Sequence, residues 1–194
     1  LAKTEFFTEN GLARAFVTNG VIPDGPHIPT DTPSAWAMKN ARALLYSKTG
    51  RYLNVKIAHT FQPQRRDVAE EADQLFEDAL HNCRNNRFRQ RNDILCTGWA
   101  YPCLAYITGR GVFSRTQGWY FGIRDRSAIP LYASLLNLKG RNECPASACL
   151  NDHFDPNRHQ DFTDFEEHLR AFLEAYFPIP APFEVEAVDT KIDA

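Results

Sequence analysis

Two histidines and two aspartates, the side chains best suited to metal or acid–base chemistry, lie close together near the C-terminal end: His153, Asp155, His159 and Asp161. Imidazole and carboxylate groups can ligate a metal or share a proton in catalysis. Their spacing matches no established ligand motif, however, and Asp-Pro-Asn at residues 155–157 is typical of a turn. We therefore expect no metal, and interpret the segment as a turn that leads into a helix.

A second cluster is rich in arginine and can hold phosphate. Its members are Arg84, Arg87, Arg89 and Arg91. In an extended chain the last three project from one face and Phe88 from the other, so they can grip phosphates while Phe88 or Trp99 stacks on a base. The alternative is a solvated loop, or arginines paired with acids of the preceding helix. The net charge of −2 favours this alternative, because it gives no long-range attraction for nucleic acid.

Five cysteines are present, and two disulfides with one free thiol would be a natural arrangement for them in a secreted protein. We expect Cys144 and Cys149 to be in disulfides, with each other or with another cysteine. The alternative is five reduced thiols in a cytosolic protein. A catalytic role also stays open, in which Cys103 or Cys149 is the nucleophile and His153 or His159 is the base.

Composition places the chain among globular proteins, since 43% of its residues are hydrophobic and 24% charged. We expect one domain over residues 1–178 and a tail over residues 179–194. No apolar run approaches the roughly 18 residues that a membrane-spanning helix needs. The chain begins at Leu1 and its only methionine is Met38, so we expect that it is not a complete translation product.

Hydrophobic periodicity predicts the elements that position these residues. Helices are expected at residues 33–48, 66–82 and 163–177. The first is capped by Thr32 and ended by Gly50, and the last begins with a capping box of Thr163 and Glu166. Strands are expected at residues 51–58, 119–123 and 129–138. The fold class that follows is α+β: a single domain with a mostly antiparallel sheet packed against about three main helices.

Parts of this pattern resemble an ADP-ribosyltransferase domain. Residues 15–22 (AFVTNGVI) are similar to the segment that sets a loop over NAD, and residues 30–37 (TDTPSAWA) to the strand-to-helix region beside the nicotinamide. Residues 50–58 resemble the core strand that follows. Residues 118–130 are similar to the closing pair of strands, which ends in Ile-Pro. Among such domains, the diphthamide-targeting bacterial toxins are the most similar.

The resemblance implies NAD as the cofactor, with Thr32, Ser34 and Trp36 at its binding site. The family's catalytic glutamate should lie just before Gly118, where this sequence has Ser114 to Gln117 and no acid. Gln117 and Ser114 are the catalytic candidates. An amide can hydrogen-bond ribose but cannot offset the positive charge that develops as nicotinamide leaves. We therefore expect weak or absent NAD turnover, raised by Gln117→Glu.

The function that follows from the resemblance is a secreted effector or toxin-like protein that acts on a host or target protein. Two other functions remain open. One is an RNA-binding module or ribonuclease that uses the arginine cluster, with nucleic acid as its partner. The other is a secreted, non-catalytic domain that binds a protein through an aromatic surface.

Overall fold

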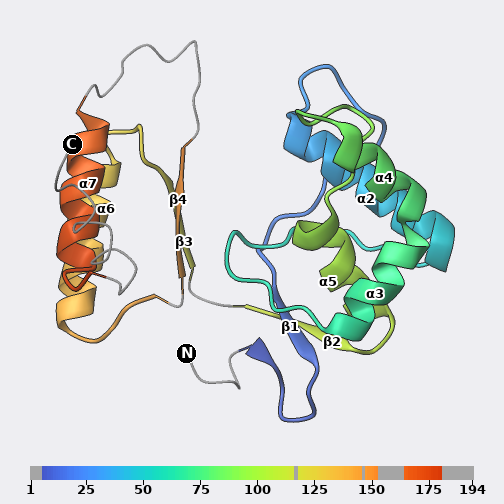
Figure 1. Ribbon diagram of the computed structural model, residues 1–194, viewed down its shortest axis with the longest axis horizontal. Helices are drawn as coiled ribbons and strands as arrows, with labels where there is room; N and C mark the ends of the chain where they lie inside the picture. The colour runs from blue at the N-terminus through green and yellow to red at the C-terminus, as the bar shows by residue number, and fades with distance from the viewer. Residues whose placement is uncertain (1–5, 116–117, 146, 153–163, 181–194) are drawn as a thin grey trace, which may run out of the picture. The chain divides into compact units, whose positions relative to one another are not determined.

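The computed structural model describes residues 6–115, 118–145, 147–152 and 164–180 (Figure 1). The chain divides into two compact units, residues 1–116 and 117–194, each with its own apolar core. We describe each unit by itself. One domain over residues 1–178 with a tail over residues 179–194 stays a prediction.

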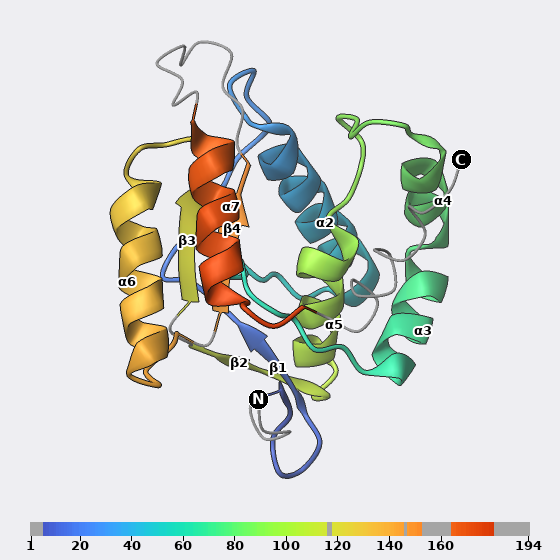
Figure 2. The same ribbon diagram turned by 60° about the vertical axis from the view of Figure 1, so that its left-hand side comes forward.

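The first unit combines short parallel strands with a group of helices. Its elements are β1 (Ala13–Phe16), α2 (Pro33–Thr49), α3 (Arg66–Leu75), α4 (Glu77–Asn85), a π-helical turn (Cys96–Ala100), α5 (Tyr101–Ile107) and β2 (Gly111–Ser114). Strands β1 and β2 pair in parallel, from Ala13 opposite Gly111 to Phe16 opposite Ser114. Helix α5 packs against both strands and against α3 (Figures 1 and 2).

Helix α2 confirms the prediction made from its end signals. The hydroxyl of Thr32 accepts a hydrogen bond from the backbone N–H of Ala35 at 3.2 Å, and Pro33 occupies the first turn. At the other end Gly50 adopts a left-handed conformation, with φ of 66°, and its N–H donates to the carbonyl of Tyr46. Both ends are thus fixed by local chemistry.

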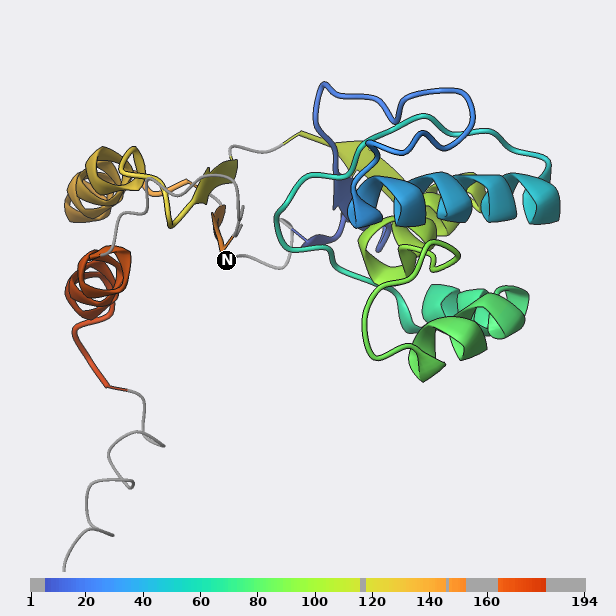
Figure 3. The same ribbon diagram turned by 90° about the horizontal axis from the view of Figure 1, so that it is seen from above.

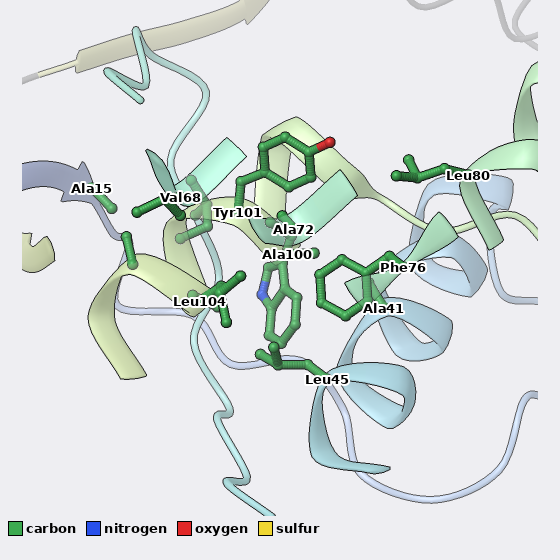
Figure 4. Close-up of a cluster of buried hydrophobic side chains, with 14 of the residues drawn as sticks. Ala15, Ala41, Leu45, Val68, Ala72, Phe76, Leu80, Ala100, Tyr101 and Leu104 are labelled. Carbon is green, nitrogen blue, oxygen red and sulfur yellow. The ribbon is translucent and has the colours of Figure 1, made fainter. Parts of the chain in front are cut away.

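The helix predicted over residues 66–82 forms, but as two helices that meet at Phe76. This residue leaves helical geometry, with φ of −113° and ψ of 19°. Its ring is buried in the core beside Ala41 and Leu45 of α2 (Figure 4). The break lets α3 and α4 run in different directions on either side of the buried Phe76.

Trp99 lies at the centre of this core and is fully buried. Its indole Nε1 donates to the carbonyl oxygen of Val55 at 2.8 Å, which satisfies the one polar atom of the ring. Val55 belongs to the segment predicted as a strand over residues 51–58, and that prediction is wrong. Only Ile57 forms a bridge, to Val17. The alternation is real, since Leu53, Val55 and Ile57 face the core, but loop contacts replace a strand ladder.

The second unit is a strand–helix–strand–helix arrangement. Its elements are β3 (Gly118–Gly122), α6 (Ala128–Gly140), β4 (Ser147–Asn151) and α7 (Phe165–Tyr176). Strands β3 and β4 pair in parallel, with Tyr120 opposite Cys149. Helices α6 and α7 lie side by side on one face of this pair (Figures 2 and 3), where Phe121, Tyr132 and Phe172 share a buried cluster.

The strand predicted at residues 129–138 is wrong, because this segment is helix α6. Ala128, Tyr132 and Leu135 are its buried residues, a spacing that belongs to a helix. Parallel strands need a crossover between them, and α6 supplies it. The mostly antiparallel sheet is therefore also wrong: the helices and strands of the described residues are six α-helices, one π-helical turn and two parallel pairs of short strands. The strand at residues 119–123 and the helix at 163–177 are confirmed as β3 and α7, while Thr163 of the expected capping box lies outside the described residues.

The predicted disulfides are absent, and all five cysteines are free thiols. Cys144 instead lies with its sulfur 3.4 Å from the hydroxyl of Tyr176. Among the described residues, no helix is both long enough and apolar enough to cross a membrane.

Candidate functional site

Arg87, Arg89 and Arg91 lie on a loop between α4 and the π-helical turn, and Arg84 lies in the last turn of α4. A buried carboxylate holds this loop. Asp93 is only 6% exposed. Its Oδ1 accepts from the side-chain amide of Asn86 at 2.6 Å, and its Oδ2 accepts from the backbone N–H of Gln90 at 2.7 Å. The carboxylate of Asp93 therefore connects Asn86, at the start of the loop, with Gln90 further along it.

Asn40 of α2 fastens the same loop to the core. Its Nδ2 donates to the carbonyl oxygens of Arg91 at 2.7 Å and Asp93 at 2.9 Å. Its Oδ1 lies 2.9 Å from Nε2 of His27. Because the amide nitrogen already donates twice, the oxygen must accept from His27, so Nε2 carries the proton. The asparagine thus joins three segments.

This scaffold presents the arginine cluster to solvent. Arg84, Arg87, Arg89 and Arg91 are all exposed. Arg87 lies over the ring of Phe88, 5.4 Å from its centroid, and Phe88 is itself 71% exposed. Arg91 lies 5.2 Å from the centroid of Trp36. No ion pair joins any of the four to a carboxylate within the described part of the chain, so their charges are available to an anion.

A pocket of about 560 Å³ has His27 in its lining. It is lined by Gly25, Pro26, His27, Lys39, Arg42, Ala43, Tyr46 and Tyr52. Two of these residues are buried cations projecting from α2, and the Pro- and Gly-rich loop before α2 folds over them.

Arg42 is 7% exposed and its guanidinium is held on several sides. One terminal nitrogen donates to the carbonyl of Ile22 at 3.1 Å, to the carboxylate of Asp24 at 3.2 Å and to the side-chain oxygen of Asn54 at 3.0 Å. The other donates to the carbonyl of Pro23 at 3.1 Å. A buried charge is tolerated only when it is paired in this way. Arg42 therefore anchors the loop to α2.

Lys39 makes a second anchor. Its Nζ donates to Asp31 at 2.8 Å and to the carbonyl of Pro26 at 3.2 Å. The hydrogen bond from Lys39, together with one from the N–H of Ile28, lowers the pKa of Asp31 below its ordinary value. Each cation of the pocket thus has its own carboxylate.

The residues expected to bind NAD have structural roles. Thr32 caps α2, Ser34 is exposed in its first turn, and Trp36 stacks on His27 with ring centroids 4.0 Å apart. Ser114 ends β2, where its hydroxyl accepts from Arg14 at 3.3 Å. Among the described residues, no hydrogen bond, ion pair or ring contact joins Ser114 to Thr32, Ser34 or Trp36. Gln117 lies outside the described residues.

Most of the other residues that the sequence offered as metal ligands, nucleophiles or bases are either outside the described residues or unsuited to the role. The histidines and aspartates of residues 153–161 lie outside the described residues. Cys103 is fully buried, and desolvation raises the pKa of its thiol, which makes it a poor nucleophile. The sequence did not predict four residues of the candidate site: Asn40, Asp93, Lys39 and Arg42. The one signal for the two cations is their position among the buried Ala37, Ala41 and Leu45 of α2.

Comparison with known proteins finds one family match and several similar proteins. Residues 141–191 match the family model described as Stealth protein CR4, conserved region 4. Over most of its length the chain is similar to bacterial enzymes that are named as polysaccharide phosphotransferases.

Three such relatives show the extent of the similarity. The chain is 30% identical to capsular polysaccharide phosphotransferase fcs1 of Haemophilus influenzae over 179 residues, which are 91% of this chain and 48% of the relative. It is 31% identical to the capsular polysaccharide phosphotransferase of Neisseria meningitidis serogroup B, over 92% of this chain and 48% of the relative. It is 34% identical to exopolysaccharide phosphotransferase SCO6021 of Streptomyces coelicolor, over 95% of this chain and 33% of the relative. The chain thus spans half or less of these relatives.

These findings correct the functional predictions. The resemblance to ADP-ribosyltransferase toxins is wrong, because the similarity to phosphotransferases extends over nearly the whole chain and the sheets of the described residues are parallel pairs. The toxin-like effector and the RNA-binding module or ribonuclease are wrong with it, as is the non-catalytic protein-binding domain. NAD as cofactor and a secreted location stay untested predictions.

Proposed function

We propose that this chain is part of a polysaccharide phosphotransferase. The observation that carries the proposal is the alignment of more than nine-tenths of the chain with enzymes of that name. In such a transfer a P–O bond forms to a hydroxyl of the saccharide and the P–O bond to the leaving group of the donor breaks. The proton of the hydroxyl is released to a base or to solvent.

The arginine cluster suits the phosphate of this reaction. Guanidinium groups bind phosphate oxygens through two parallel hydrogen bonds and stay charged at any relevant pH. Phosphoryl transfer depends largely on positioning and on stabilising charge at the phosphorus oxygens. Arg87, Arg89 and Arg91 are exposed and are fixed through Asp93 and Asn40. We assign them the role of holding the phosphate group.

The acceptor in this proposal is a saccharide. A host or target protein, which the sequence led us to expect as partner, has no role in it and stays a prediction. Nucleic acid, which the sequence left only as a possible partner, has no role in it either.

Two measurements on the full-length protein test the proposal. The first incubates it with nucleotide-activated sugars and capsule-type oligosaccharides and follows phosphodiester formation by ³¹P NMR. A new phosphodiester signal is expected, and its absence with every donor and acceptor would contradict the proposed class of enzyme.

The second measurement titrates the protein with glucose 1-phosphate. Arg87→Ala and Arg89→Ala should each weaken binding about tenfold, which corresponds to roughly 1.4 kcal/mol. Arg51→Ala removes the same charge from an exposed position outside the cluster and should have little effect. Equal affinity of all three variants would show that phosphate binds elsewhere.

A further inference from the structure

Two tyrosines form an aromatic corner in the pocket beside α2. Tyr46 and Tyr52 are each 52% exposed. Their ring centroids are 6.2 Å apart and their planes meet at 82°. The guanidinium of Arg42 lies over the ring of Tyr52, 5.1 Å from its centroid. About half of each tyrosine is therefore exposed, and both line the pocket.

Polar groups next to this corner have unused hydrogen-bonding capacity. One oxygen of Asp24 accepts from both Arg42 and the hydroxyl of Tyr52, while the side chain as a whole is 70% exposed. A carboxylate has about four acceptor positions, so two or more remain. The ammonium of Lys39 uses two of its three donors, on Asp31 and Pro26. Lys39 lines the pocket and offers a donor, while Asp24 is bonded to two lining residues, Arg42 and Tyr52, and offers acceptors at its edge.

Charge in the pocket is already balanced. Lys39 is paired with Asp31 and Arg42 with Asp24. An anion such as phosphate would have to displace these carboxylates, and the exposed arginine cluster offers it a better site. A neutral ligand rich in hydroxyl groups does not have to displace these carboxylates from Lys39 and Arg42. Its C–H face can lie on an aromatic ring while its hydroxyls bond to the carboxylate and the ammonium.

We propose that this pocket binds one neutral sugar ring of the saccharide, with Tyr46 and Tyr52 contacting the ring face and Asp24 and Lys39 its hydroxyls. A volume of about 560 Å³ is enough for a monosaccharide unit. The assignment rests on the proposed function for its choice of ligand. The arginine cluster holds the phosphate, and Asn40 and His27 connect it structurally to the pocket.

Saturation-transfer NMR on the full-length protein tests this site with four neutral disaccharides: maltose, lactose, cellobiose and chitobiose. We expect transfer to the ring protons of at least one. Tyr46→Ala and Tyr52→Ala should each weaken binding of that sugar about tenfold. Tyr52→Phe keeps the ring but loses the hydrogen bond to Asp24, so it should retain most of the binding. Tyr106→Ala removes a tyrosine that is 45% exposed elsewhere on the unit and is the matched control.

Two further results separate this site from the proposed function. Glucose 1-phosphate should still bind through its phosphate in the Tyr46→Ala variant, and the disaccharide should still bind in Arg89→Ala. Sugar binding without any phosphodiester formation would contradict the enzyme class and leave the pocket assignment standing. No transfer to any of the four sugars, or transfer that persists in both alanine variants, would overturn the assignment.

Discussion

Asn40 donates its side-chain amide to the carbonyl oxygen of Asp93 at 2.9 Å, although the two residues are 53 positions apart in the sequence. The contact joins helix α2, which lines the pocket, to the loop that carries Arg87, Arg89 and Arg91. Together with the bond from Asn40 to the carbonyl of Arg91, it makes the position of the loop arginines depend on a residue of α2.

Asn40→Ala should loosen the arginine loop. The change leaves the carbonyls of Arg91 and Asp93 without their donor, and each lost bond of this kind costs about 1–3 kcal/mol. Amide hydrogen exchange over residues 86–95 should accelerate at least about tenfold. Asn40→Asp should behave similarly, since a carboxylate cannot donate. Asn85→Ala, on the exposed end of α4, is the control. Unchanged exchange in Asn40→Ala would show that Asp93 alone holds the loop.

Arg42→Lys should destabilise the first unit by about 2–3 kcal/mol. A lysine keeps the charge but has a single nitrogen, which cannot serve the acceptors that the guanidinium reaches from Ile22 to Asn54. Urea unfolding followed by circular dichroism measures the loss. Arg51→Lys, at an exposed position, should stay within about 0.5 kcal/mol of the parent protein. If Arg42→Lys also changed the free energy of unfolding by no more than about 0.5 kcal/mol, water would be replacing the lost hydrogen bonds.

The pH dependence of stability should include a contribution from Asp67. A hydrogen bond from Arg65, aided by Arg110, lowers the pKa of Asp67 from its ordinary value of 3.8 to about 2. Because the folded state favours the charged carboxylate, its contribution is complete above about pH 4–5 and is lost as the pH falls toward 2. The urea midpoint of Asp67→Asn should therefore fall less steeply over this interval than that of the parent protein.

Glu77→Gln provides the comparison for Asp67→Asn, because it removes an exposed carboxylate that takes no part in the Arg65–Arg110 cluster. A pH profile of Asp67→Asn that coincides with that of the parent protein would contradict the assigned role of Asp67.

The sequence predicted elements where their signals are local. Helix α2 is defined by Thr32, Pro33 and Gly50, all at its own ends. Residues 129–138 carry no such end signals, and their apolar run is compatible with either periodicity. What decides for a helix is the buried spacing of Ala128, Tyr132 and Leu135, which depends on packing against Phe121 of β3 and Phe172 of α7. Parallel pairing likewise joins strands that are far apart in sequence.

The candidate site shows the same division. The arginine cluster is visible as a run of side chains, but its anchors, Asn40 and Asp93, are ordinary polar residues until the fold brings them together. The ADP-ribosyltransferase resemblance failed for a related reason. An extended segment, a Pro-rich loop and a capped helix occur in many folds, so residues 15–58 carried too little information to specify one.

Gly111→Ala should disturb the β1–β2 pair. A Cβ at this position would lie 2.9 Å from the Cβ of Ala105 and 3.2 Å from the carbonyl oxygen of Ala13, so backbone as well as side-chain atoms would have to move. Overpacking of this kind costs about 1–3 kcal/mol. Exchange of the Ala13 amide, which donates to Arg110 at 3.0 Å beside the contact, should accelerate. Gly140→Ala is the matched control, because a Cβ there meets no atom within 4 Å. It should stabilise the end of α6 by a fraction of a kcal/mol. If Gly111→Ala is as stable as the parent protein, α5 can retreat from the strands, and the close approach at Ala105 is not what sets their position.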